Sequence, residues 1–358
     1  MAVPKYNILI LGASYGSLLA SKMMLGGHNM TLVCLPAEAD LINAEGFRVR
    51  MPIRGSSEPI EIDSRKLPGK VTAAGPGEVN PKDFDLIGLA MQEPQYGSDG
   101  VRELLDAVAK SRVPCMSIVN MPPLPYMKRI PALDSEALKP AYTNPAVWDN
   151  FDPGTLTLCS PDPQAIRPPN EKVNVLQVTL PTNFKVARFD SEAGNRILRG
   201  IATDIDAVGF ETPEGKIDLP VKLRFHESLF VPLAKWSMLM AGNYRCITKD
   251  GMRTAKEAVH SDIAESRAIY DFVIDVCVRL GTARDELVPF DKYAVAAESL
   301  SCPASAARAL NNGAPNIERA DKLVQLVARQ KGMSSPILDA IVALVDARLD
   351  TNRKKAAA

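Results

Sequence analysis

An apolar run that ends in a glycine-containing turn constrains the fold of this sequence more than any other feature. Residues 6–11 are largely apolar, as expected of a strand that is buried on both faces. The turn at residues 12–17 follows directly, and residues 17–25 then have helical periodicity. A second strand is expected at residues 30–35. The sequence therefore predicts a strand–helix–strand unit with parallel strands and a right-handed crossover.

The alternation of strands and helices continues and then changes character. Further strands are expected at residues 84–91, 113–119, 155–159 and 173–180, and helices at 101–111 and 191–208. Residues 211–222 contain Pro213, Gly215 and Pro220, which predict a linker. After it only helices are expected, at 229–241, 254–280, 293–310, 317–331 and 336–349. We predict an α/β fold, with a Rossmann-type parallel sheet in a first domain at 1–218 and an all-helical second domain at 219–352.

Composition excludes several classes of protein. The chain has 358 residues, which suits two domains. Lys plus Arg and Asp plus Glu both number 42, so the basic surface of a nucleic-acid binder is not expected. No apolar run approaches the ~20 residues that span a membrane, and the N-terminus is expected to form a strand rather than a signal peptide. The expected compartment is the cytoplasm.

Metal binding is not expected from the sequence either. The six cysteines include no C-x-x-C pair, and there are only three histidines. Zinc sites need closely spaced Cys and His ligands. The cysteines are therefore interpreted as scattered and mostly buried thiols.

The turn after the first strand predicts a phosphate-binding site. A Rossmann unit binds pyrophosphate at a glycine-rich turn, because the backbone must approach the phosphates and the following helix offers free N–H groups. Here the turn has Ser14 in place of the middle glycine of G-x-G-x-x-G, and the final glycine comes one residue early. The expected cofactor-binding residues are Gly12, Ser14, Tyr15, Gly16 and Ser17. The alternative is a glycine-rich turn of a flavodoxin-like or other α/β fold.

The end of the second strand does not distinguish NADP from NAD. An acid there would bind the ribose 2′-hydroxyl, and an arginine would bind a 2′-phosphate. Residues 32–36 contain neither. Glu38 and Asp40 come slightly later, where they are expected to begin a helix.

Several stretches in the same order resemble the ketopantoate reductase (2-dehydropantoate 2-reductase) family. They are residues 12–33, 41–49 and 305–336, together with Asn120 in VNMPP and with Lys235 and Asn243 in AKWSMLMAGN. The resemblance covers most of the chain and implies a divergent member. It implies a helical domain similar to the C-terminal domain of 6-phosphogluconate dehydrogenase. It also implies NADP as cofactor, with NAD as an alternative, and a small 2-oxo acid or ketone as substrate. The resemblance further implies a cytoplasmic oxidoreductase that acts on CH–OH groups and that could form a homodimer.

The resemblance assigns roles to five residues. Lys235 would be the proton donor, Asn120 would lie near the nicotinamide and also bind the cofactor, and Glu318 would hold the substrate hydroxyl or tune the lysine. The substrate would contact Asn243 and Ser305. The chemistry agrees, because hydride addition leaves negative charge on the carbonyl oxygen, and a cation that donates a proton stabilises that charge.

Helical spacing adds an argument for two of these residues. Lys235, Leu239 and Asn243 follow one another at intervals of four, so a regular helix would place them on one stripe, with Lys235 and Asn243 pointing into one cleft. Each of three residues also has a purely structural interpretation that remains open. Lys235 would then be a solvated lysine. Glu318 would lie in the first turn of a helix capped by Asn316, and Ser305 would be an ordinary polar helix residue.

The sequence also departs from the family. Leu239 stands where a second asparagine is common, and Ala90 stands where many members have a lysine. These departures predict a less polar 2-oxo acid than ketopantoate. Two other functions stay open: an opine-type dehydrogenase on the same two-domain plan, and a nucleotide-binding redox sensor without turnover.

Overall fold

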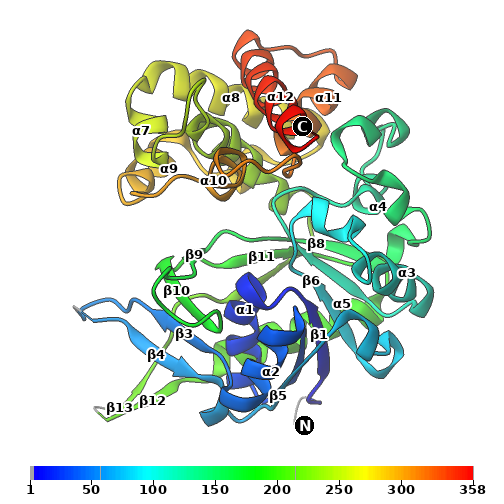
Figure 1. Ribbon diagram of the computed structural model, residues 1–358, viewed down its shortest axis with the longest axis vertical. Helices are drawn as coiled ribbons and strands as arrows, with labels where there is room; N and C mark the ends of the chain where they lie inside the picture. The colour runs from blue at the N-terminus through cyan, green and yellow to red at the C-terminus, as the bar shows by residue number, and fades with distance from the viewer. Residues whose placement is uncertain (1–3, 57, 214, 358) are drawn as a thin grey trace. The chain divides into compact units, whose positions relative to one another are not determined.

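The chain forms two compact units, each described here on its own. The computed structural model describes residues 4–56, 58–213 and 215–357. The first unit comprises the chain up to residue 91 together with 95–119 and 146–227. The second comprises 92–94, 120–145 and the chain from 228 onward. In Figure 1 the strands belong to the first unit, and helices α7 to α12 belong to the second.

The first unit contains the predicted parallel sheet. Its strand order is β14-β11-β8-β7-β6-β1-β2-β5, and the six strands from β5 to β8 are all parallel. The order reverses beside β1, as in doubly wound dinucleotide-binding folds. The prediction of a Rossmann-type sheet is therefore confirmed. The strands are β1 (Asn7–Leu11), β2 (Asn29–Val33), β5 (Val71–Ala74), β6 (Leu86–Leu89), β7 (Cys115–Ile118), β8 (Leu156–Ser160), β11 (Phe184–Ala187) and β14 (Leu223–His226).

Helix α1 (Ala13–Leu25) lies in the interior of this unit. Every residue from Gly16 to Leu25 is buried, which explains why its sequence lacks a clear polar face. Helix α3 (Val101–Ser111), by contrast, is amphipathic and buries Leu104, Leu105, Val108 and Ala109. Helices α2 (Pro36–Glu45) and α5 (Glu192–Ala207) complete the α/β layers, and α1 packs against β2 and against α5.

A second, smaller sheet was not fully anticipated by the sequence. Its order is β4-β3-β10-β9, formed by β3 (Arg48–Met51), β4 (Ile60–Asp63), β9 (Gln164–Ile166) and β10 (Val175–Leu180). β3 pairs with β10 in parallel, and the other two pairings are antiparallel. This sheet packs against α1 and brings residues from beyond position 160 beside the N-terminal part of the chain.

The boundary between the units differs from the predicted one at 218/219. The expected linker forms a hairpin of β12 (Phe210–Thr212) and β13 (Gly215–Ile217), and β14 then pairs with β11 in the main sheet. The first unit thus extends to Glu227. Residues 120–145 join the second unit, where the Gln330 side chain both accepts from the backbone N–H of Asp134 and donates to its carbonyl, each at 2.9 Å.

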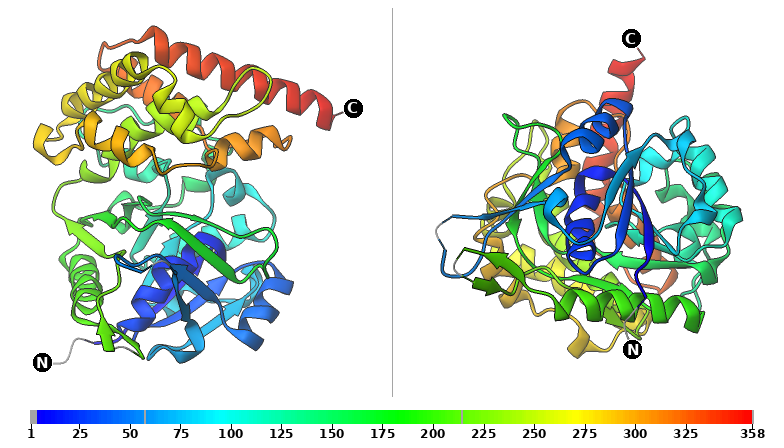
Figure 2. Two further views of the ribbon diagram at one scale, coloured as in Figure 1. Left: turned by 90° about the vertical axis from the view of Figure 1, so that its left-hand side faces the viewer. Right: turned by 90° about the horizontal axis from the view of Figure 1, so that it is seen from below.

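The second unit is helical, as predicted, but its helices are shorter and more numerous. The expected helix at 254–280 is divided, because Asp262 caps a new helix by accepting the Glu265 N–H at 2.9 Å. The expected helix at 293–310 is divided near Pro303. The helices are α4 (Leu124–Met127), α6 (Lys235–Met238), α7 (Ala255–His260), α8 (Ile263–Leu280), α9 (Phe290–Ala297), α10 (Ser305–Asn311), α11 (Ala320–Gln330) and α12 (Pro336–Ala356), the last a long rod in Figure 2.

The prediction of one regular helix at 229–241 is wrong. A 3₁₀ turn at Val231–Ala234 leads into the four-residue α6, which is followed by a π-helical turn at Leu239–Asn243. A π turn shifts the register, so Lys235, Leu239 and Asn243 do not form the regular stripe that intervals of four would give.

Packing against α9 explains the irregular turn. The Tyr293 hydroxyl donates to the carbonyl of Met238, the residue directly before the π-helical turn, at 3.2 Å. Gly242 makes room for this contact, because a Cβ atom there would lie 2.0 Å from the Tyr293 hydroxyl oxygen. The local shape of the chain after Lys235 therefore depends on a glycine and a distant tyrosine.

We predict that Gly242→Ala destabilises the protein by about 2 kcal/mol, typical of overpacking a filled core. Tyr293→Phe alone should cost about 1 kcal/mol, the value of its hydrogen bond. The double variant should be more stable than Gly242→Ala, because removal of the hydroxyl relieves the clash. Urea unfolding measures all three, and independent, additive losses would contradict the proposed contact.

Candidate functional site

The glycine turn lies at the point where the strand order of the main sheet reverses. Gly12 precedes α1 with a positive φ of 107°, and a Cβ atom there would lie 2.7 Å from the carbonyl oxygen of Ala90. A Cβ at Gly16 would lie 2.6 Å from Cγ2 of Ile10. Both positions therefore require glycine, the first for the turn and the second for packing of the helix on β1. The turn therefore has a glycine at both positions where the backbone requires one, although its final glycine comes one residue early.

The other residues of the turn differ in how they are held. Ser14 is exposed at the start of α1, whereas Ser17 is buried and donates to the Ser14 carbonyl at 2.9 Å. The Tyr15 hydroxyl donates to the carbonyl of Pro163 at 2.6 Å. The first turn of α1 contains no acidic residue, so the positive end of the helix dipole is open to an anion. Cofactor binding by these residues remains a prediction.

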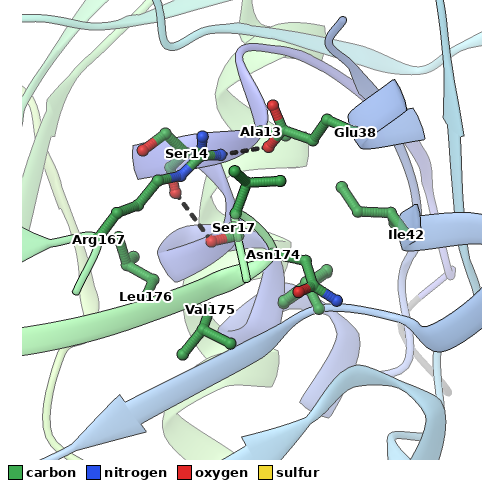
Figure 3. Close-up of a pocket in the computed structure, with 11 residues that line it drawn as sticks. Ala13, Ser14, Ser17, Glu38, Ile42, Arg167, Asn174, Val175 and Leu176 are labelled. Carbon is green, nitrogen blue, oxygen red and sulfur yellow. Dashed lines mark hydrogen bonds and ion pairs between the residues drawn. The ribbon is translucent and has the colours of Figure 1, made fainter. Parts of the chain in front are cut away.

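A narrow crevice opens beside this turn (Figure 3). It lies between the start of α1, the helix α2, the segment that follows β9 and the start of β10, and its side chains leave no enclosed space for a water molecule. Glu38 and Arg167 form an ion pair across it. Asn174 also lines it; this side chain is only 4 % exposed, and its Oδ1 accepts no hydrogen bond from the described residues. The crevice thus combines one carboxylate, one guanidinium and one unsatisfied oxygen.

Sequence reasoning found only part of this crevice. It correctly placed Glu38 in the first turn of a helix, now α2. Arg167 and Asn174 were missed, because they come from a hairpin more than a hundred residues later and belong to no motif.

A second group of candidate side chains lies entirely within the second unit. Glu318 lies just before α11 and is 8 % exposed. Its carboxyl group accepts hydrogen bonds from the side chain of Asn120 and from the backbone N–H of Glu93. The structure therefore brings together Asn120 and Glu318, two of the residues that the resemblance had singled out.

Glu93 was not predicted, although it follows β6 closely, and polar residues at the carboxyl ends of parallel strands are functional candidates. Its side chain is 4 % exposed. One carboxyl oxygen, Oε1, accepts the Thr143 backbone N–H at 3.0 Å. The other, Oε2, has no hydrogen-bond partner among the described residues. Burial raises the pKa of Glu93, and hydrogen bonds from Thr143 and Asn144 partly oppose this.

The charge of Glu93 acts on the Glu318 carboxyl group. Burial, and to a smaller extent this nearby charge, raise the pKa of Glu318 to about 7 against the opposing hydrogen bonds from Glu93 and Asn120. A carboxyl group with such a pKa exchanges a proton at neutral pH, which is the property required of a general acid or base. Perturbed acids of this kind are concentrated at functional sites.

The backbone around Glu318 is fixed by Tyr244, which directly follows Asn243. The Tyr244 hydroxyl donates to the Glu318 carbonyl and accepts the Ala320 N–H. The alternative in which Asn316 caps a helix containing Glu318 is wrong, because α11 begins only at Ala320. Asn316 instead accepts a hydrogen bond from Arg353 at 3.1 Å.

The remaining predicted residues occupy different environments. Lys235 begins α6 and is 7 % exposed, so the alternative of a solvated lysine is wrong. Asn243 is half-buried at the end of the π-helical turn, and Ser305 is exposed at the start of α10. The roles of these three residues remain predictions.

The described residues also bear on metal binding and on membrane insertion. No three His, Cys, Asp or Glu side chains gather closely enough to hold a metal ion within the described ranges. No described helix is long and apolar enough to cross a membrane.

Comparison with known proteins identifies the fold. No family model matches the sequence, and no curated protein matches it. Solved structures do match over nearly the whole chain. A probable 2-dehydropantoate 2-reductase from Bacillus subtilis superposes with a TM-score of 0.61 at 12 % identity, covering 96 % of this chain and 99 % of that one. A 2-dehydropantoate 2-reductase from Methylococcus capsulatus gives a TM-score of 0.61 at 16 % identity, with 97 % of both chains covered.

A second kind of enzyme has the same fold. A D-mandelate dehydrogenase, solved with NADH and anilino(oxo)acetate, superposes with a TM-score of 0.62 at 12 % identity, covering 97 % of this chain and 99 % of that one. The likeness to ketopantoate reductases that the sequence suggested is thus confirmed for the fold. At these identities the activity of this chain has to be argued from its own residues.

We predict that Glu93→Gln lowers the pKa of Glu318, because the isosteric amide removes a neighbouring negative charge but retains the backbone contact. A ¹³C NMR titration of carboxyl-labelled glutamates measures this pKa, with Glu318→Gln identifying the signal. Glu136→Gln, a substitution on the surface of the same unit, is the control and should leave the titration unchanged. An unchanged Glu318 titration in Glu93→Gln would show that the two groups are not coupled.

Proposed function

We propose that this protein is an NAD(P)H-dependent reductase of a 2-oxo acid or a related ketone. In this proposal the first unit binds the dinucleotide at the Gly12–Gly16 turn, and the second unit supplies the acid–base groups. The observation that carries the proposal is the buried Glu318 carboxyl group with its partners Asn120 and Glu93, in a chain that also has an open helix N-terminus after its first strand.

The site residues match what ketone reduction requires. The nicotinamide, when bound, supplies the hydride. The carbonyl oxygen then gains negative charge and must receive a proton. Lys235 is proposed as the donor, since a mostly buried ammonium group stabilises the charge and releases a proton to it. Glu318, which titrates near neutral pH, is proposed to hold the substrate hydroxyl and to restore the proton of the lysine.

The other residues have supporting roles in this proposal. Asn120 orients Glu318 and lies beside the nicotinamide. Asn243 and Ser305 bind the substrate carboxylate or neighbouring polar groups. Leu239 stands where the family has a polar residue, and on that ground we propose a substrate less polar than ketopantoate; the leucine itself is buried in the core of the second unit. The family resemblance favours NADP, while the neighbouring dehydrogenase structure contains NADH.

The proposal is tested by cofactor binding and turnover. NADH or NADPH fluorescence should increase on mixing with the protein, and absorbance at the nicotinamide band should fall when a suitable 2-oxo acid is added. The reduction rate should decrease as pH rises through about 7, because Glu318 then loses its proton. Turnover that requires an added amine would indicate an opine-type dehydrogenase, and binding without turnover of any 2-oxo acid would indicate a redox sensor. Robust turnover of ketopantoate itself would contradict the less polar substrate.

We predict that Lys235→Ala reduces the turnover rate by a factor of about 10² or more, typical of a lost proton donor. Cofactor affinity should be nearly unchanged, because the dinucleotide is assigned to the other unit. Steady-state kinetics and fluorescence titration measure the two effects separately. Lys256→Ala on α7 is a matched control in the same unit and should retain full activity. A wild-type rate in Lys235→Ala would remove the lysine from the mechanism.

A further inference from the structure

The crevice beside the glycine turn contains side chains that the proposed function leaves unused. We infer that Glu38, Arg167 and Asn174 together select between the two nicotinamide dinucleotides, and that they favour NADH over NADPH. This inference rests on the proposed function, because it assumes that the turn binds a dinucleotide. It goes beyond the family resemblance, which favours NADP.

The crevice lies where a doubly wound fold would place the adenosine ribose of a bound dinucleotide. In doubly wound folds the pyrophosphate lies at the first helix N-terminus, and the ribose lies at the end of the second strand. Ser14 from the start of α1 and Glu38 from the first turn after β2 line the same crevice (Figure 3). A ribose attached to a pyrophosphate at the glycine turn therefore has its 2′ substituent near Glu38.

The charges around this position do not favour a 2′-phosphate. Arg167 is the cation that lines the crevice, and its guanidinium is already paired with the Glu38 carboxylate. The pair has no net charge, so it offers little attraction to a phosphate dianion. A phosphate there would also face the Glu38 carboxylate, whose charge is stabilised at the N-terminus of α2.

The hydrogen-bonding groups favour a free hydroxyl. The amide nitrogen of Asn174 donates to the carbonyl of Gly46 at 2.7 Å, so the amide presents its oxygen as an acceptor. That oxygen is buried and accepts no hydrogen bond from any described group. The crevice therefore has two acceptors, Asn174 Oδ1, which has no donor among the described residues, and the Glu38 carboxylate, which accepts from Arg167. Ribose hydroxyls have protons to donate, whereas a phosphate dianion has none.

The hairpin that carries Arg167 is held firmly in place. Lys172, in the loop between β9 and β10, pairs with Glu45 at the far end of α2 at 2.7 Å. Glu171 in the same loop pairs with Arg50 at 2.7 Å. Two of these ion pairs join α2 to the hairpin: Glu38–Arg167 inside the crevice and Glu45–Lys172 outside it. The Glu45–Lys172 pair therefore provides a matched control.

We test the inference by measuring dissociation constants of NADH and NADPH by fluorescence titration, without substrate. The wild-type protein should bind NADH more tightly. Glu38→Gln should reduce the preference by about tenfold, because it removes the repelling charge and frees Arg167 for the phosphate. Adding Arg167→Met to Glu38→Gln should abolish that gain, while Arg167→Met alone should weaken NADPH binding further.

A control variant and two kinds of contrary result distinguish a failure of this inference from a failure of the proposed function. Glu45→Gln removes the outer ion pair and should leave the ratio of the two dissociation constants unchanged. Tighter wild-type binding of NADPH, or an unchanged ratio in Glu38→Gln, would overturn the inference while leaving the reductase proposal intact. Failure of the wild-type protein to bind either dinucleotide would overturn the proposed function itself.

Discussion

The close approach of the chain at Gly12 to the carbonyl group of Ala90 is the contact on which the rest of the first unit depends. The 2.7 Å that separates a hypothetical Cβ from that oxygen leaves no space for any side chain. Because the chain passes so close, α1 begins immediately after β1, and its N–H groups lie at the reversal of the strand order. The same tight packing continues at Gly16, where α1 meets Ile10 of β1. The open helix end is therefore a consequence of steric packing rather than of the exact glycine spacing.

The second unit depends on a different constraint, which is the burial of carboxyl groups. An ionised carboxylate removed from water is costly, so the group either gains hydrogen bonds or retains its proton. Glu318 does both, since Asn120 and Glu93 contact it while its pKa is raised to about 7. Glu93 keeps one oxygen without a partner. Such groups are concentrated at functional sites, which is why we propose an acid–base role for this pair.

The departures from the family pattern are consistent with one another. The absent lysine at position 90 is explained by packing, because Ala90 lies against Gly12 and Gly16 in the turn. The leucine at position 239 is part of the core of the helical unit. The crevice beside the turn carries an internal ion pair in place of an uncompensated cation. The first two changes fill the interior, whereas the ion pair bears on the charge offered to a ligand, which is why we expect an unphosphorylated ribose.

Much of the fold could be predicted from local sequence. Buried parallel strands correspond to apolar runs, and α3 and α5 begin close to their predicted residues, because periodicity and capping are local properties. The first helix, predicted from residue 17, begins at Ala13. The divided helices were harder to predict. The π-helical turn after Lys235 depends on Tyr293, which lies more than fifty residues later, so regular spacing alone suggested a stripe that does not form.

The sequence by itself determined the order of α/β and helical parts, the position of the glycine turn after the first strand, and the identity of Asn120, Lys235 and Glu318 as candidates, since these follow from short-range patterns. Only the tertiary structure decided that Glu93 lies against Glu318 and that Arg167 and Asn174 line the crevice with Glu38. The reason is physical: pKa values and ion pairs depend on burial and on distances of a few ångströms between residues far apart in the chain, and no local pattern encodes those distances.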